Sequence, residues 1–180
     1  MKTLFRALLL AAAFCSSAAH AGSIYNFSYT FDDNSTVTGS LNGTLNGDFV
    51  TGISDVHLFF NNTEYLGSLL QAGFNGATDN WDAAGGAQVS VNAALNNFIF
   101  ADADPANDLG NVSNYFYFVN DASLGQQVFA NTFNTGEAAF DAPANGSWTL
   151  EARVPEPATG ALLLTGLGLM GAMARRRRQD

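Results

Sequence analysis

Four oxygen-bearing side chains gather in one short segment, at Asp102, Asp104, Asn107 and Asp108. Carboxylate and amide oxygens close together in a loop suit Ca²⁺, which takes about six to eight oxygen ligands at about 2.3 to 2.6 Å. The spacing lacks the alternating ligands, the glycine and the distant glutamate of an EF-hand loop. Asp and Asn are also ordinary residues of turns. The segment therefore predicts either a calcium-binding loop or a plain turn, and the sequence leaves both open.

Aromatic side chains are the second group that could bind a ligand. In the run Tyr115-Phe116-Tyr117-Phe118, a strand would place the two phenylalanines on one face and the two tyrosines on the other. Trp81 lies in a polar segment that resembles a loop. Aromatic rings stack on the apolar faces of sugars, just as they pack in cores. Trp81, Tyr115 and Tyr117 are therefore candidates either for ligand stacking or for packing inside the fold.

Few residues of the chain suit catalysis. His57 is the only histidine after residue 21, and no lysine, cysteine or Gly-x-Ser-x-Gly motif occurs after that point. Asp55 and His57 would share a face of a predicted strand, but a triad also needs a serine that the sequence does not identify. The fourteen acidic residues of 22–153 offer many carboxylate pairs of the kind glycoside hydrolases use, so no particular pair is informative. We expect no catalytic site.

Charge is distributed very unevenly along the chain. Residues 22–153 contain eleven Asp and three Glu against Arg153 alone, a net charge of −13. Phosphate binding releases counterions only where Lys or Arg replaces them, so this composition excludes nucleic acid as a partner. Anionic polymers would be repelled unless a divalent cation bridges them. The length fits one domain, which can bury about two thirds of its unfolded surface.

Residues 1–21 predict a secretory signal peptide that signal peptidase removes. Lys2 and Arg6 give it a basic start, an apolar run follows over 8–14, and Ala19-His20-Ala21 is a small-x-small cleavage site. The apolar run is too short for a stable membrane span.

Cys15 is the only cysteine, and it lies inside the predicted signal peptide. Lipoprotein processing at Cys15 is the alternative, but Phe14 is bulkier than the small residue expected before such a site. Removal of the peptide would leave a domain without a disulfide or a thiol nucleophile, so its stability would come from its core.

Alternating apolar and polar residues predict a fold made of short strands. The expected strands cover residues 25–31, 37–45, 49–60, 63–66, 87–93, 97–101, 115–120, 128–133 and 147–154. Asn61-Asn62 is expected to form a two-residue hairpin turn, since asparagine tolerates the left-handed backbone. A helical turn is expected over 68–72 and a loop over 74–86. Without a long amphipathic helix, the pattern predicts an all-β domain over 22–153, a β-sandwich of jelly-roll-like or similar type.

Residues 154–180 predict a membrane anchor. Residues 158–174 carry no charge and would form a helix about 25 Å long, at the short end of what spans a bilayer. The basic cluster after it would stay on the cytoplasmic side as a topology stop: Arg175, Arg176, Arg177 and Arg178. A terminal core helix with a basic tail is the alternative, but residues 158–174 lack the polar face of such a helix. We expect a transmembrane helix over 158–174 and a cytoplasmic tail over 175–180.

A proline-rich motif at 154–157 precedes this span. Pro155 and Pro157 each confine the backbone φ angle to a narrow range and remove a backbone donor, so the segment resists both helix and sheet. An extended, exposed segment at the membrane surface is what a processing enzyme can grip.

The motif, the glycine- and leucine-rich span and the arginine cluster, in this order, resemble the PEP-CTERM sorting signal of Gram-negative bacteria that make extracellular polysaccharide. The resemblance covers residues 154–178, and only Gln179-Asp180 extends past the pattern. It implies that a membrane-embedded exosortase recognises Pro155, Glu156 and Pro157, and that the domain is then released or re-attached at the surface.

The resemblance implies an exported protein with an inner-membrane-anchored intermediate, destined for the cell surface or extracellular matrix. We expect a structural, adhesive or matrix role, in exopolysaccharide or biofilm, without catalysis. The expected partners are signal peptidase, an exosortase, the membrane before processing and extracellular polysaccharide. A carbohydrate-binding module, assisted by calcium, is the alternative, followed by a glycoside hydrolase that uses acidic residues.

Overall fold

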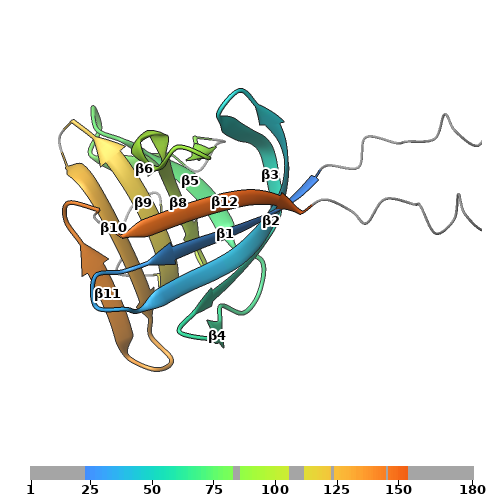
Figure 1. Ribbon diagram of the computed structural model, residues 1–180. Coiled ribbons are helices and arrows are strands. Elements are labelled where there is room, and N and C mark those ends of the chain that lie inside the picture. Colours follow the sequence, from blue (N-terminus) through green and yellow to red (C-terminus); the bar gives the residue numbers. More distant parts are fainter. Residues whose placement is uncertain (1–22, 83–85, 106–111, 123, 145, 154–180) are drawn as a thin grey trace, which may run out of the picture.

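Short antiparallel strands dominate the computed structural model, which describes residues 23–82, 86–105, 112–122, 124–144 and 146–153. Figure 1 shows the strands in two sheets that face each other. One sheet, here sheet A, contains β1 (Ser23–Thr30), β2 (Thr36–Asn46), β3 (Phe49–Phe60), β4 (Thr63–Glu64), β7 (Val89–Ser90) and β12 (Ser147–Arg153). The other, sheet B, contains β5 (Leu70–Asn75), β6 (Asn80–Asp82), β8 (Asn97–Ala101), β9 (Asn114–Asp121), β10 (Gly125–Thr132) and β11 (Glu137–Asp141). The prediction of an all-β fold is confirmed.

The order of strands differs from that of a jelly roll. Sheet A has the order β12-β1-β2-β3-β4, with β7 also paired to β3, and sheet B has the order β11-β10-β9-β8-β5-β6. Consecutive strands therefore stay neighbours over β1–β3 and over β8–β11, whereas a jelly roll is built from two Greek keys. Tight connections explain the difference, since a two-residue turn such as Gly47-Asp48 has no length to cross between sheets.

Most predicted strands are confirmed, and the segment between β4 and β8 contains most of the errors. The helical turn expected over 68–72 is wrong, because β5 starts at Leu70 and pairs with β8 through Ala72 and Ile99. The loop expected over 74–86 is wrong where Asn80–Asp82 forms β6.

Two other segments also differ from the prediction. The strand expected over 87–93 is reduced to β7, after which a 3₁₀ turn, η1 (Ala93–Leu95), is capped by the Asn92 side chain. Strand β11 was not predicted, since its alanine-rich sequence alternates only weakly.

Aromatic side chains fill the space between the sheets. Residues on alternate positions of β1, β8 and β9 point inward, as does Phe60 at the end of β3, and the largest fully buried side chains include Tyr29, Phe60, Phe98, Phe100, Phe116 and Phe118. This confirms the predicted division of residues 115–118, since Phe116 and Phe118 lie in the core. Burial of apolar side chains stabilises by about 1.5 to 3 kcal/mol each, so this cluster is the main source of stability.

The last strand closes the sandwich beside the first. Seven residue pairs join β12 to β1, from Ile24 with Arg153 to Thr30 with Ser147. Trp148 of β12 packs on core phenylalanines, and its ring nitrogen donates a hydrogen bond to the Ser90 carbonyl at 2.8 Å. Figure 1 accordingly shows the start of β1 and the end of β12 side by side.

The predicted signal peptide (1–21) and sorting signal (154–180) lie outside the described residues. Within the part of the chain that the structure describes, we find no helix with the length and apolar character needed to cross a membrane.

Candidate functional site

The outward face of sheet B carries a continuous row of rings, here called the aromatic face: Phe74, Trp81, Tyr115, Tyr117, Phe129 and Phe140. Strand register produces it. Phe140, Phe129 and Tyr117 are direct cross-strand partners on β11, β10 and β9, and Ile99 continues the row on β8. Side chains on alternate residues of a strand share a face, so these residues oppose the core-facing set.

Ring geometry makes this face one packed unit. Tyr115, Tyr117 and Phe129 lie nearly parallel, with centroids 5.5 to 6.4 Å apart and interplanar angles of 7° to 21°. Phe140 extends the group at 6.0 Å from Phe129. Such pairs contribute about 0.5 to 1.5 kcal/mol beyond area burial, so the rings hold one another in place.

The three predicted stacking residues thus come together, but they differ in accessibility. Trp81 is only 7% exposed, because it packs between Phe74 and Tyr117 at 5.4 and 5.6 Å. Tyr115 and Tyr117 are half-buried. Burial raises the pKa of Tyr115, and burial with a smaller contribution from Tyr115 raises the pKa of Tyr117 to about 12. Both tyrosines are therefore neutral at any physiological pH.

Sequence reasoning missed the most exposed rings in and next to sheet B. Phe140 is 53% exposed on the edge strand β11, and Phe133, directly after β10, is 76% exposed. A signal was present in each case, namely a large apolar residue among polar or small neighbours, but strand β11 itself was not predicted.

The predicted calcium ligands are only partly within the described chain. Asn107 and Asp108 lie outside it. Asp102 accepts hydrogen bonds from the backbone nitrogens of Ser113 and Asn114 at 3.1 and 3.0 Å, and from the Asn114 side chain at 2.7 Å. Its carboxylate therefore joins the end of β8 to the start of β9. Among the described residues no group of three or more His, Cys, Asp or Glu could hold a metal, and calcium binding by Asp102 and Asp104 stays a prediction.

Another carboxylate, that of Asp141, links the two sheets. Asp141 of β11 is buried and accepts a 2.7 Å hydrogen bond from the Tyr29 hydroxyl of β1. It also accepts from the Asp32 backbone nitrogen at 3.3 Å, while the Gly146 nitrogen donates to the Tyr29 hydroxyl. Burial, followed by the hydrogen bond to Asp141, raises the pKa of Tyr29 above its ordinary value. This arrangement is structural.

The pair Asp55 and His57 does not form part of a triad in the described chain. The Asp55 carboxylate accepts a hydrogen bond from the Asn42 side chain at 2.7 Å. The His57 ring nitrogen lies 3.9 Å from a Glu64 oxygen, and both side chains are exposed.

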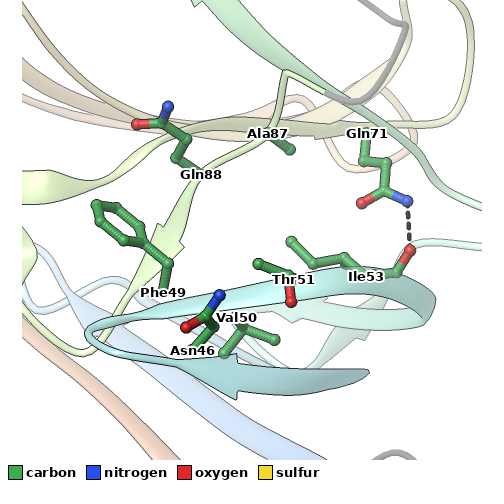
Figure 2. A pocket seen from close by; sticks show the side chains of 9 residues that line it. Asn46, Phe49, Val50, Thr51, Ile53, Gln71, Ala87 and Gln88 are labelled. Carbon is green, nitrogen blue, oxygen red and sulfur yellow. Dashed lines mark hydrogen bonds between the residues drawn. The ribbon is translucent and has the colours of Figure 1, made fainter.

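A pocket of about 450 Å³ lies at the tip of the β2–β3 hairpin, and sequence reasoning missed it. We call it the hairpin pocket. It is lined by Asn46, Phe49, Val50, Thr51, Gly52, Ile53, Gln71, Ala87 and Gln88. Figure 2 shows Phe49 and Gln88 at one end and Gln71 with Ile53 at the other. No local pattern predicts this site, because it joins β3, β5 and the segment before β7.

A gap in the edge of sheet A creates this pocket. Strand β7 pairs with Phe49 and Val50, and β4 pairs with Phe59 and Phe60, so the middle of β3 has no strand partner on that side among the described residues. In this gap the Gln71 amide nitrogen donates a hydrogen bond to the Ile53 carbonyl, which a neighbouring strand would otherwise satisfy (Figure 2).

Comparison with known proteins identifies the end of the chain. A model of the PEP-CTERM protein-sorting motif matches residues 153–178, which confirms the resemblance of the Pro155-Glu156-Pro157 segment. The chain therefore carries a PEP-CTERM sorting signal, which implies an exported protein that an exosortase sorts toward the cell surface. No curated protein and no solved structure matches the chain.

Proposed function

We propose that this protein is a non-catalytic component of the cell surface or extracellular matrix that attaches to polysaccharide. The aromatic face is the observation that carries the proposal. Tyr117, Phe129 and Phe140 are direct cross-strand partners in this face, and the row ends in Phe140, its one exposed ring. Exposed apolar patches on folded domains mark interaction sites.

Rings and charge together favour a sugar polymer as the partner. The apolar faces of sugars pack on aromatic side chains, while the half-buried tyrosine hydroxyls can hydrogen-bond to sugar hydroxyls. The net charge of −13 over 22–153 opposes anionic surfaces. A neutral polysaccharide, or an anionic one bridged by a divalent cation, fits both properties.

A role without catalysis agrees with how the Asp141 and Asp102 carboxylates are used. Asp141 accepts a hydrogen bond from a tyrosine of the facing sheet, and Asp102 fixes the backbone between two strands. Each carboxylate contributes to the fold, and hydrogen bonds to charged groups are worth about 1.5 to 3 kcal/mol.

The sorting signal would direct the exported domain to the cell surface. In this proposal an exosortase recognises Pro155, Glu156 and Pro157, after the arginines of 175–178 have held the apolar span in the membrane. The span acts as a temporary handle before the domain reaches the surface.

Cosedimentation of the full chain in detergent with insoluble matrix polysaccharide tests the proposal. We expect the wild-type protein to sediment with the polymer, and the Phe133→Ser/Phe140→Ser variant to lose most of this binding. Leu66→Ser is the matched control, since Leu66 is 71% exposed but lies next to β4 in sheet A. Equal sedimentation of all three proteins, or none, would overturn the proposal.

A further inference from the structure

We infer that the hairpin pocket binds one unit of a neutral saccharide, at a site separate from the aromatic face. The inference rests on the proposed role at the cell surface and adds a second, more selective contact. Small-molecule sites have volumes of about 300 to 1,000 Å³, and this pocket of about 450 Å³ falls in that range.

Free amide groups supply the polar contacts. The side chains of Asn46 and Gln88 are exposed and form no hydrogen bond within the described residues. Gln71 uses its amide nitrogen on Ile53, which leaves its amide oxygen as an acceptor. A carboxamide carries donors and an acceptor side by side, which matches neighbouring hydroxyl groups that can each donate and accept.

Apolar side chains supply the floor. Phe49, Val50 and Ile53 come from one strand, β3, and line the pocket together with the amides. Val50 and Ile53 are buried and therefore fixed, while Phe49 is half-buried. A sugar ring has both properties that this surface requires, an apolar face and a rim of hydroxyls.

Charge excludes the main alternatives. None of the nine lining residues is ionisable, in a domain with fourteen acidic residues. A cation would find no carboxylate in the lining, and an anion would enter against the net negative charge of the domain. The ligand chemistry that remains is neutral and polar.

The β3 edge also disfavours a peptide strand as the occupant. Gly52 and Asp55 have positive φ values of 63° and 48°, and the β2–β3 register shifts between Ser40 and Thr44. Such irregularities interrupt the row of backbone groups that an added strand would need. A compact ligand needs no such row.

Saturation-transfer NMR on the full chain in detergent micelles tests the inference. The probes are neutral oligosaccharides of glucose, galactose, mannose and N-acetylglucosamine, with an alginate oligomer as the anionic comparison. We expect transfer to at least one neutral oligosaccharide and none to alginate. The Asn46→Ala/Gln88→Ala variant should bind at least tenfold more weakly with an unchanged melting temperature, while Asn134→Ala, an exposed amide outside the pocket, should bind normally.

Two results would overturn the inference: no transfer to any neutral probe, or equal binding by wild type and the Asn46→Ala/Gln88→Ala variant. The Phe133→Ser/Phe140→Ser variant separates the two sites. If it loses cosedimentation and no oligosaccharide binds, the proposed function stands and the pocket site falls. If oligosaccharide binds without any cosedimentation, the pocket site stands and the aromatic face falls.

Discussion

Tyr29 and Asp141 join strands that lie 112 positions apart in the sequence, one in each sheet. A buried carboxylate that lost its tyrosine donor would keep its desolvation cost without the compensating hydrogen bond. Removing the tyrosine hydroxyl should therefore cost more stability than the net contribution of a typical hydrogen bond. The sequence could not reveal it, because nothing in the local patterns around β1 or the unpredicted β11 connects the two residues.

Replacing Tyr29 by phenylalanine should lower the free energy of unfolding by about 1 to 3 kcal/mol, since it leaves an Asp141 oxygen buried without this donor. Urea titration measures the loss. Thr132→Val is the matched control: its hydroxyl is fully buried and has no hydrogen-bond partner in the described residues, so its removal should cost little. A larger loss for the threonine variant would contradict this assignment.

The same titrations should depend on pH in the alkaline range. Because burial raises the pKa of Tyr29 and Tyr65, the folded state keeps protons that the unfolded state releases near pH 10. Their contribution is complete below that pH and is lost as pH rises further, so stability falls. The fall should be shallower in the Tyr29→Phe variant.

At the scale of elements, the β3–β4 hairpin shows what turn chemistry can decide locally. Asn61 and Asn62 have φ values of 46° and 67°, as the two-residue turn predicted from the sequence requires. The Asn61 side chain also accepts a hydrogen bond from the Thr36 nitrogen at 2.9 Å, which ties the turn to the start of β2.

Asn62 therefore tests the turn without disturbing that hydrogen bond. Asn62→Gly should leave stability unchanged or raise it slightly, because glycine adopts positive φ without strain. Asn62→Val should lower the free energy of unfolding by about 1 to 2 kcal/mol, the cost of a left-handed L-residue. Thermal unfolding of both variants measures the difference. Equal melting temperatures would show that the turn conformation is not required.

Local patterns predicted elements well where the apolar signal is strong, as in β8, a continuous apolar run whose bounds of 97–101 match the expectation. They were wrong where long-range pairing decides. Leu66, Leu69 and Leu70 have helical spacing, yet β5 forms because Ala72 pairs with Ile99 on β8. Trp81 appeared to lie in a polar loop because its partners, Phe74 and Tyr117, come from other strands. The hairpin pocket was missed for the same reason, since its lining residues come from segments far apart in the sequence.

At the scale of the whole molecule, the sorting signal follows directly after the last structural strand. Strand β12 ends at Arg153, and the matched motif begins at the same residue. Leu150 is buried and Trp148 packs on Phe27, Phe98 and Phe118, so β12 is part of the core as well as an edge. The folded domain and the sorting signal therefore meet at one residue.

Any stable processed form should retain β12. Loss of a large core side chain costs about 2 to 5 kcal/mol, and removal of β12 would delete several contacts from a fold worth about 5 to 15 kcal/mol in total. Mass spectrometry of the protein from fractionated cells should therefore find C-terminal ends at or beyond Arg153. A stable species ending within residues 147–152 would contradict this, and an intact arginine tail in every fraction would argue against processing.

The pairing of β1 with β12 also determines how the domain bears load. The two strands run antiparallel, with Ile24 opposite Arg153, so a force that separates the chain ends acts first on that pair. The hydrogen bonds would then open one after another, as in a zipper, and little force is needed for each. The fold is thus least resistant to a force that pulls Ser23 and Arg153 apart at the same time.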